Sequence, residues 1–358
     1  MANIVGFYDI VKEIKESLES KDILLYAFNA TGKTRLSCEF DSDYEQEESQ
    51  NALCYNAIIE DYFTWDNIEK TMFLTPESWL CKFVKDEGLD GRICENFRLF
   101  TDSKLQPKID FESGEIQFFM ATGDDQSQLP IKISKGEETL FKWNMFYTVM
   151  EYALEILEEK EEDRTTDKFN ALKYIIIDDP ISSLDDYKIY TLSMQLLMLM
   201  KMVHDKHPEI KFLITTHHAL FFNIIYNTLK NRKEKQISYV MSKNNLEVEL
   251  RALRRDETLL YHQSIIEEIM IAIANETLQK KHFNMFRSVL EKFTVFLGYE
   301  NWLDLFDKYS EKDSLNKLIN MNSHERYADM EAKDLTAEQL KVFKDGFDYF
   351  KSTYKIKV

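Results

Sequence analysis

The sequence predicts an α/β head with a phosphate-binding loop, followed by an all-helical C-terminal domain. Strands alternate with helices between residues 170 and 230, which is typical of a parallel sheet covered by helices. A phosphate-loop triplet, Gly32-Lys33-Thr34, follows an apolar strand and opens a helix. From about Thr258 the apolar periodicity is helical only. We therefore expect two domains, at residues 1–255 and 256–358.

Composition and charge narrow the class of protein. Of the 358 residues, 44% are hydrophobic, which allows a sizeable core and excludes disorder throughout. The net charge of −18 argues against a protein that coats nucleic acid non-specifically, although a local basic surface remains possible. The four cysteines lack CxxC spacing, so neither a zinc site nor a disulfide framework is expected. With no signal peptide and no apolar run of about 20 residues, we expect a cytoplasmic protein without membrane contact.

The head is expected to alternate strands and helices. A continuous apolar run that ends at a charged or small residue predicts a buried parallel strand, and an apolar stripe at helical spacing predicts a helix. These patterns place strands at 22–28, 174–177 and 211–215, short strands and turns at 51–66 and 109–120, helices at 138–164 and 187–204, and a hairpin at 237–250.

Capping signals mark the helices of the C-terminal domain. An apolar stripe runs from Lys280 to Leu297, and Gly298 is expected to end that helix in a left-handed conformation. Thr336 and Gln339 have the spacing of a capping box, which predicts the start of the last helix.

The segment from Ala27 to Thr34 predicts a phosphate loop, with Ala27 in place of the usual first glycine. Backbone amides at the start of a helix bind phosphates, Lys33 reaches the β and γ phosphates, and the Thr34 hydroxyl binds Mg²⁺. Taken alone, the triplet also fits a plain junction between a strand and a helix. The predicted nucleotide-binding residues of this loop are Asn29, Ala30, Thr31, Gly32, Lys33 and Thr34.

A second motif supports this assignment. Tyr174 to Asp178 is an apolar strand that ends in a carboxylate, which is the Walker B pattern, and Asp179 follows it. A carboxylate at the carboxyl end of a parallel strand beside the phosphate loop is placed to bind Mg²⁺. We therefore expect Thr34 and Asp178 to hold the metal, and Asp179 to orient or deprotonate the attacking water.

Three further motifs resemble those of ATP-binding-cassette (ABC) ATPases. Ser134, Lys135, Gly136 and Glu137 resemble the signature motif, Asp185 stands in the D-loop position, and His217 follows the next strand where the switch histidine is expected. The resemblance implies an ABC-type head that binds Mg²⁺ with ATP or GTP. Because the signature completes the site of a partner subunit in that family, it also implies a homodimer or higher homo-oligomer.

The head departs from the ABC pattern in two respects. Asp179 stands where most of these ATPases have glutamate, which suggests slow, switch-like hydrolysis. The span from Thr34 to Ser134 is too short for long coiled-coil arms. The glutamine of the Q-loop is not located.

In the C-terminal domain, Arg287 and Glu291 lie four residues apart on the helix from Lys280, so they are neighbours on its surface. An ordinary ion pair is the simplest interpretation of the two. About 30 residues later comes the string Ile319-Asn-Met-Asn-Ser-His324.

Seven strings together resemble the bacterial anticodon nuclease family PrrC, over nearly the whole chain. The resemblance implies an ABC-type NTPase head and a helical ribonuclease domain similar to HEPN folds. Members cut the anticodon loop of tRNA, best known for lysine tRNA on the 5′ side of the wobble base, as a suicide antiviral defence. They are silenced by a type I restriction–modification complex and respond to GTP and thymidine nucleotide, so dTTP is a possible regulator. The strings are YAFNATGKTRLS, YNAIIEDYFTWDN, IKISKGEETLFKW, YIIIDDPISSLDD, ITTHHALFFN, HFNMFRSVLEKFTVFLGYENW and LINMNSH.

The resemblance maps the catalytic triad of the family onto Arg287, Glu291 and His324. These residue types suit a ribonuclease without a metal in its nuclease site. Glu291 and His324 can serve as base and acid, in an order that the sequence leaves open. Arg287 can hold phosphate oxygens as negative charge develops.

A basic segment joins the two domains. Residues 228–255 contain eight basic and three acidic residues, and this excess of positive charge predicts part of an RNA-binding surface. A solvated hairpin is the alternative. The predicted RNA-binding residues are Lys230, Arg232, Lys233, Arg251, Arg254, Arg255, Lys280 and Lys281.

Two other functions compete with the tRNA nuclease. One is an armless DNA-repair ABC ATPase without nuclease activity, and the other is a sensor scaffold that binds nucleotide and recruits a separate toxin. Neither requires the set of Arg287, Glu291 and His324.

Overall fold

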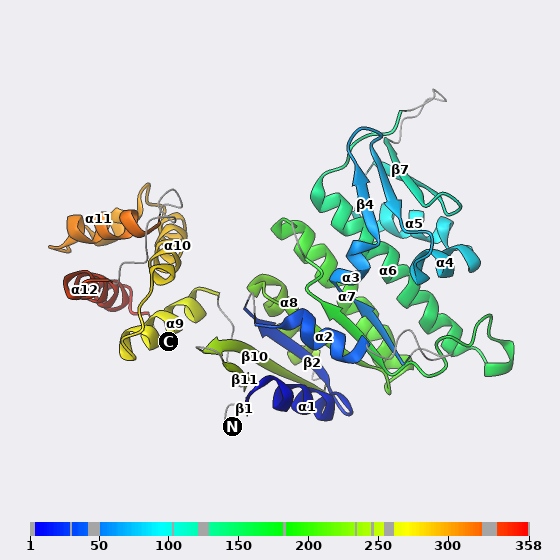
Figure 1. Ribbon diagram of the computed structural model, residues 1–358, viewed down its shortest axis with the longest axis horizontal. Coiled ribbons are helices and arrows are strands. Elements are labelled where there is room, and N and C mark those ends of the chain that lie inside the picture. The colour runs from blue at the N-terminus through cyan, green and yellow to red at the C-terminus, as the bar shows by residue number, and fades with distance from the viewer. Residues whose placement is uncertain are drawn as a thin grey trace. The chain divides into compact units, whose positions relative to one another are not determined.

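The computed structural model describes residues 4–28, 31–41, 51–101, 104–120, 129–181, 184–232, 235–244, 247–253, 261–323 and 335–356. The chain divides into two compact units, Met1–Thr258 and Leu259–Val358 (Figure 1). The first unit is the α/β head and the second is helical, as the sequence predicts. The boundary expected between residues 255 and 256 falls within residues 254–260, outside the described part of the chain.

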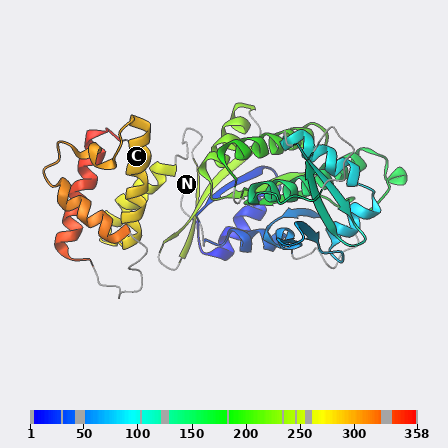
Figure 2. The ribbon, with the colours of Figure 1, turned by 90° about the horizontal axis from the view of Figure 1, so that it is seen from above.

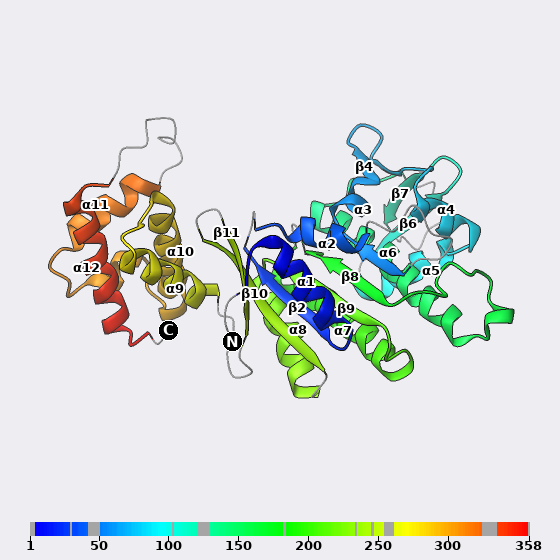
Figure 3. The ribbon, with the colours of Figure 1, turned by 60° about the horizontal axis from the view of Figure 1, so that its bottom comes forward.

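The head is built on a seven-stranded sheet in the order β1-β11-β10-β2-β9-β8-β3. The five strands from β10 to β3 are parallel, whereas β1 and β11 pair antiparallel at one edge. Strand β9 lies between β2 and β8, and all three are parallel. Their carboxyl ends therefore lie side by side at the same end of the sheet (Figure 3). The strands are β1 (Ile4–Val5), β2 (Asp22–Ala27), β3 (Ala52–Tyr55), β8 (Tyr174–Asp178), β9 (Lys211–Thr216), β10 (Gln236–Asn244) and β11 (Glu247–Ala252).

Every residue of β2 is buried, as expected for a strand covered on both faces. Helix α1 (Phe7–Leu18) contacts β2, β9 and β11, and α2 (Lys33–Asp41) contacts β8 and β3. Helix α8 (Ala219–Arg232) contacts β2, β9 and β10, and it packs against α7 (Asp186–Lys206). The predicted hairpin is confirmed, with Val240 opposite Arg251 in the β10–β11 pair.

A second, smaller antiparallel sheet has the order β4-β5-β7-β6. Strand β7 alternates between buried and partly exposed side chains, so one of its faces joins the core. The elements of this part are α3 (Ala57–Asp61), β4 (Phe63–Asp66), β5 (Thr71–Leu74), α4 (Trp79–Asp86), α5 (Asp90–Thr101), β6 (Leu105–Asp110) and β7 (Glu115–Met120).

The long helix α6 (Lys135–Glu158) begins earlier and ends earlier than predicted. It begins at Lys135 because Ser134 and Glu137 form a reciprocal capping box. It ends at Glu158, and Arg164 folds back after η1 (Glu161–Asp163) so that its guanidinium bonds the carbonyl oxygens of Leu157 and Glu159. An arginine that bonds the last carbonyls ends a helix favourably, and sequence periodicity does not reveal this contact.

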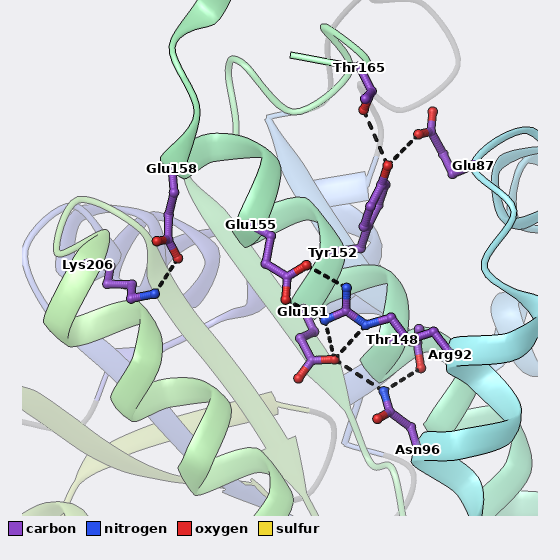
Figure 4. Close-up of polar contacts among 10 residues, drawn as sticks. All are labelled: Glu87, Arg92, Asn96, Thr148, Glu151, Tyr152, Glu155, Glu158, Thr165 and Lys206. Carbon is purple, nitrogen blue, oxygen red and sulfur yellow. Dashed lines mark hydrogen bonds and ion pairs between the residues drawn. The ribbon is translucent and has the colours of Figure 1, made fainter. Parts of the chain in front are cut away.

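Polar contacts fasten α6 to its neighbours (Figure 4). Arg92 of α5 lies 2.7 Å from Glu151 and 2.5 Å from Glu155, two residues four apart on α6. Lys206, the last residue of α7, lies 2.5 Å from Glu158 at the end of α6. These pairs tie α5 and α7 to the same side of the helix that carries the signature motif.

The second unit is built of helices (Figure 2). They pack round an aromatic core, in which Phe286 contacts the rings of Phe343, Phe347 and Phe350. Gly298 ends α10 at φ 75°, and Thr336 begins α12 with a capping box, as predicted. None of the described helices is long and apolar enough to cross a bilayer. The elements are α9 (Tyr261–Ala274), α10 (Lys280–Leu297), η2 (Trp302–Phe306), α11 (Lys312–Ser323) and α12 (Ala337–Thr353).

Candidate functional site

The phosphate loop lies between the end of β2 and the start of α2. Gly32 has φ 100°, a backbone conformation that residues with a Cβ rarely adopt, and it directly precedes the helix. The Lys33 side chain is buried, and its Nζ donates to the carbonyl oxygen of Ala27 at 3.3 Å. Thr31 and Thr34 flank it, the first buried and the second exposed. Asn29 and Ala30 lie outside the described residues.

Asp178, the last residue of β8, is hydrogen-bonded by hydroxyl groups from two elements, α2 and β9. Thr215 of β9 donates a hydrogen bond to one carboxylate oxygen, and Ser37 of α2 donates to the other at 3.4 Å. Thr34 also bonds this carboxylate. Burial raises the pKa of Asp178, and the hydrogen bonds from Thr215 and Thr34 oppose that rise.

The predicted metal ligands, Thr34 and Asp178, are therefore brought together. A hydroxyl oxygen and a carboxylate oxygen side by side are the hard ligands that suit Mg²⁺, which usually completes its shell with nucleotide phosphate and water. The residues present thus fit the predicted ion.

Asp179 adopts φ 53°, so the backbone turns directly after the Walker B strand. Its carboxylate pairs with Nδ1 of His217 and lies 3.7 Å from Nζ of Lys33. Burial raises the pKa of Asp179, but the hydrogen bond and charge of His217 and the charge of Lys33 outweigh burial and leave it below its ordinary value. The structure therefore joins the phosphate-loop lysine, the second acid and the predicted switch histidine in one cluster.

The signature residues occupy the amino terminus of α6. Ser134 accepts from the amide of Glu137, whose carboxylate accepts from the amide of Ser134 at 2.7 Å. Lys135 and the buried Lys142 each lie within 2.9 Å of Glu138. Gly136 is buried in the same turn.

The D-loop aspartate has a structural role in the chain. Asp185 is the N-cap of α7, where it accepts a hydrogen bond from the amide of Lys188 at 2.9 Å. It is exposed in the described head.

Three residues of the nucleotide site were not predicted from the sequence. Ser37 and Thr215 bond the Walker B carboxylate, and Glu60 lies close enough to Asp179 for the charge of Asp179 to raise its pKa. Burial is the larger cause of that rise, and Tyr55 donates a hydrogen bond to Glu60 at 3.1 Å. Glu60 belongs to the string YNAIIEDYFTWDN, which carried the family resemblance but gave no clue to its contacts.

In the helical unit, Arg287 and Glu291 form the expected pair on α10, with Nε 2.8 Å from the carboxylate. Arg287 also donates from Nη1 to the side-chain oxygen of Asn320 on α11, at 3.1 Å. Asn320 in turn donates to Asn316 at 2.7 Å. Asn320 was missed as a site residue, although it lies within the string LINMNSH.

His324, the third predicted catalytic residue, lies outside the described residues. It follows Ser323, the last residue of α11, and Asn320 stands four residues before it in the sequence. The Glu291 side chain is 54% exposed and that of Arg287 is 27% exposed, so the pair reaches the surface of the helical unit.

The predicted RNA-binding residues differ in their surroundings. Lys230 lies over the ring of Tyr226, and Arg232 donates to the carbonyl oxygen of Leu197 at 3.1 Å, so both are partly engaged within the head. Arg251 is half-buried on β11, and Lys280 is exposed at the start of α10. Lys233, Arg254, Arg255 and the Lys281 side chain lie outside the described part of the chain.

Comparison with known proteins gives matches over both units. A family model described as an AAA domain matches residues 112–348, from the small sheet of the head to α12. The chain is 34% identical to a protein named anticodon nuclease from Escherichia coli, over 92% of this chain and 88% of that protein.

Two solved structures are similar to the chain at low sequence identity. One is an SMC head bound to the C-terminal winged-helix domain of ScpA, with a TM-score of 0.37 and 9% identity, which covers 67% of this chain and 92% of that one. The other is the SMC head domain from Thermotoga maritima, with a TM-score of 0.33 and 12% identity, covering 66% and 92% of the two chains.

Proposed function

The chain belongs to the AAA domain family and to the family of the Escherichia coli anticodon nuclease, and from that premise we propose that it cleaves the anticodon loop of a tRNA under the control of an NTP-binding head. The observation that carries the proposal is the Arg287–Glu291–Asn320 contact across α10 and α11, in a chain that also holds a P-loop and a Walker B pair. A DNA-repair ATPase or a sensor scaffold needs the P-loop and the Walker B pair but not the Arg287–Glu291–Asn320 contact.

The head is proposed to bind ATP or GTP. Lys33 supplies a cation to the β and γ phosphates, and Thr34 and Asp178 would hold Mg²⁺, which neutralises phosphate charge when bound. Asp179 pairs with His217 and lies 3.7 Å from Lys33, and these two residues hold its pKa below the ordinary value, which favours an ionised carboxylate beside the lysine. That position suits an acid that orients the attacking water.

The nuclease reaction is proposed to need no metal at its own site. The ribose 2′-OH attacks the adjacent phosphorus as Glu291 or His324 removes its proton, and the other residue protonates the departing 5′ oxygen. Arg287 stabilises the negative charge on the phosphorane oxygens. Glu291 and Asn320 fix the plane of its guanidinium from two helices. The products are a 2′,3′-cyclic phosphate and a 5′-OH.

The finer parts of the proposal rest on the family resemblance. They are cleavage of lysine tRNA on the 5′ side of the wobble base, an antiviral role, silencing by a type I restriction–modification complex and regulation by dTTP. We also propose that the head forms at least a homodimer when nucleotide is bound, because the signature residues Ser134 to Glu137 complete the site of a partner in ABC proteins.

The proposal is tested by mapping the ends of tRNA after expression of the protein and its variants. Arg287→Ala, Glu291→Gln and His324→Ala should each lower the cleavage rate by about 10²–10⁴-fold, the usual effect of removing one acid–base group. Cleavage should persist in chelator once the active conformation has formed, and a substrate with deoxyribose at the cut site should resist.

Glu300→Gln is the matched control, because Glu300 is an exposed carboxylate of the same unit outside the site, and it should cleave at the normal rate. Far-ultraviolet circular dichroism of each variant checks that the fold is retained. A 5′-phosphate product, or full activity of His324→Ala, contradicts the mechanism. Intact tRNA together with DNA-stimulated NTP hydrolysis favours the DNA-repair ATPase instead.

A further inference from the structure

The last two turns of α10 carry apolar side chains that the core of the helical unit does not use. Further back on the helix, Phe286 and Leu290 are fully buried, and Phe293 packs against the same core. Val295 and Phe296, by contrast, are 78% and 85% exposed. Scattered apolar residues are common on protein surfaces, but a contiguous exposed patch marks a binding surface.

This patch adjoins the Arg287–Glu291 pair on the same helix. Residues four apart on a helix are neighbours on one face, so Val295 lies one turn beyond Glu291, about 6 Å further along the axis. Lys292 is exposed and stands four residues before Phe296, which makes its ammonium group a neighbour of the Phe296 ring. The exposed Tyr299 follows directly after the glycine that ends the helix. We call Lys292, Val295, Phe296 and Tyr299 the α10 patch.

The size of the α10 patch argues against a stable protein interface. Its three apolar side chains expose on the order of 400 Å², which is the size of a typical functional patch on a monomer. A stable protein–protein interface buries about 800 Å² on each partner, roughly twice as much. The patch is therefore better matched to a ligand that covers only a few side chains.

The chemistry of the α10 patch suits a single-stranded nucleotide. Exposed aromatic rings with a cation beside them bind single strands, because the bases stack on the rings and the cation contacts the phosphate. The bases of an RNA loop are unpaired and free to stack in this way. Arg287 and Glu291 have opposite charges, so the pair adds no net charge of its own for the phosphates that flank the cut. Lys292 supplies that charge next to Glu291.

We propose that the α10 patch holds an unpaired nucleotide of the RNA loop beside the cut, with its base stacked on Phe296 and its phosphate on Lys292. The inference rests on the proposed nuclease function and names substrate contacts of that site. Every base has a π face, so Phe296 contributes affinity for the loop and little discrimination between bases.

The test measures binding of a fluorescent anticodon stem–loop RNA with deoxyribose at the cut site, by anisotropy on the full chain. Phe296→Ala should raise the Kd by about 5- to 150-fold, the range for the loss of one stacked base. Phe296→Trp should retain the affinity. Phe296→Leu keeps an apolar side chain but has no π face, so it should resemble Phe296→Ala. Equal affinity of Phe296→Leu and the unchanged protein contradicts stacking.

The stacked base is identified with RNAs that carry one abasic nucleotide at each loop position in turn. For the unchanged protein, the abasic RNA should bind more weakly at the stacked position. Phe296→Ala should lose nothing further at that position, because each change removes one partner of the same contact. Losses that add up fully at every position contradict the contact between Phe296 and a base.

The salt dependence tests the phosphate contact. Lys292→Gln should reduce the slope of log K against log salt concentration by about 0.7, the value for one phosphate on a single strand. An unchanged slope contradicts the contact of Lys292 with a phosphate.

Ile271→Ala and Lys341→Gln are the matched controls, since Ile271 is an exposed apolar residue on α9 and Lys341 an exposed lysine on α12. Both should bind the RNA as the unchanged protein does. If Phe296→Ala binds RNA normally but no longer dimerises with nucleotide in light scattering, the patch is a protein interface and the proposal is wrong. An unchanged protein that neither binds the stem–loop nor cleaves tRNA refutes the proposed nuclease itself. That result differs from a protein that cleaves tRNA without using Phe296, which refutes only the α10 patch.

Discussion

The pKa values of the two neighbouring aspartates of the Walker B motif shift in opposite directions. Asp178 ends β8 among hydroxyl groups, and burial raises its pKa. Asp179 turns at φ 53° toward His217 and Lys33, which hold its pKa below the ordinary value. The sequence predicted both carboxylates and their order, because an apolar strand that ends in acids is a local pattern. It could not predict Ser37, Thr215 or Glu60 around them, because those contacts join residues from four separate elements.

A buried carboxylate at the start of α6 gives a test at the same scale. The Glu138 side chain is 9% exposed and lies 2.9 Å from Lys142, which is also buried. Burial raises the pKa of Glu138, but hydrogen bonds and charges from Lys135 and Lys142 outweigh burial and lower it below its ordinary value of 4.5. A lowered carboxyl pKa contributes stability above that ordinary value, and the contribution is lost as pH falls through the lower folded-state pKa.

We expect Glu138→Gln to reduce the free energy of unfolding at pH 7 by about 1–3 kcal/mol, because a buried ammonium loses its charged partner. The difference from the unchanged protein should shrink as pH falls below 4.5. Urea denaturation across this pH range measures it. Glu112→Gln removes an equally close but exposed partner of Lys85 and should have a much smaller effect, because solvent screens an exposed pair. Equal costs for the two variants, or a Glu138→Gln cost that grows in acid, contradict this assignment.

At the scale of elements, the order of strands and helices was largely predictable and their ends were not. Apolar runs identified β2, β8 and β9, and the stripe from Lys280 to Leu297 identified α10 with its terminal glycine. Helix α6 begins after the Ser134 cap and ends where Arg164 bonds its last carbonyl groups. Neither Ser134 nor Arg164 belongs to the apolar stripe from which the helix was predicted. The pairing of α10 with α11 through Arg287 and Asn320 also escaped prediction, since it depends on how helices pack and not on local spacing.

The packing of α12 on α11 makes a prediction about one glycine. A Cβ on Gly346 would meet both Cδ atoms of Leu315 at 2.7 Å, and Leu315 is fully buried. Replacement of a helix glycine by alanine ordinarily stabilises by up to about 1 kcal/mol. Overpacking against a side chain that cannot swing aside costs about 1–3 kcal/mol, so Gly346→Ala should be net destabilising.

Gly91→Ala is the matched control, because a Cβ on Gly91 of α5 meets nothing within 4 Å, and it should be neutral or stabilising. The sign for Gly346→Ala should reverse in a Leu315→Ala background, where space for the new methyl group exists. Chemical denaturation followed by circular dichroism compares the unchanged protein with the three single variants and the double variant. Stabilisation by Gly346→Ala alone contradicts the close packing of α11 and α12.

At the scale of the whole chain, one polypeptide carries two candidate sites, one in each unit. The head contains the Lys33–Asp179 cluster, and the helical unit contains the Arg287–Glu291 pair with its own aromatic core. The sequence predicted this division because alternating strands and helices stop before residue 258 and separate motifs lie on either side. Each unit has a core of its own, so a small change within one site is not expected to disturb the fold of the other.

This division predicts that the two activities can be separated by single substitutions. Lys33→Ala removes the cation that we propose binds the β and γ phosphates, so it should abolish NTP hydrolysis and, with it, nucleotide-dependent dimerisation and activation of the nuclease. Arg287→Ala should leave hydrolysis and dimerisation intact and lower tRNA cleavage by about 10²–10⁴-fold, because it removes the charge stabilisation that we propose for the scissile phosphate. Phosphate release, light scattering with a non-hydrolysable nucleotide and tRNA end-mapping measure the three properties on the same preparations.

A protein that stays monomeric with saturating nucleotide contradicts the proposed assembly. If Arg287→Ala lost NTP hydrolysis as completely as Lys33→Ala, the nuclease unit would be part of the NTPase site, and gating of one unit by the other could not be the way the protein works.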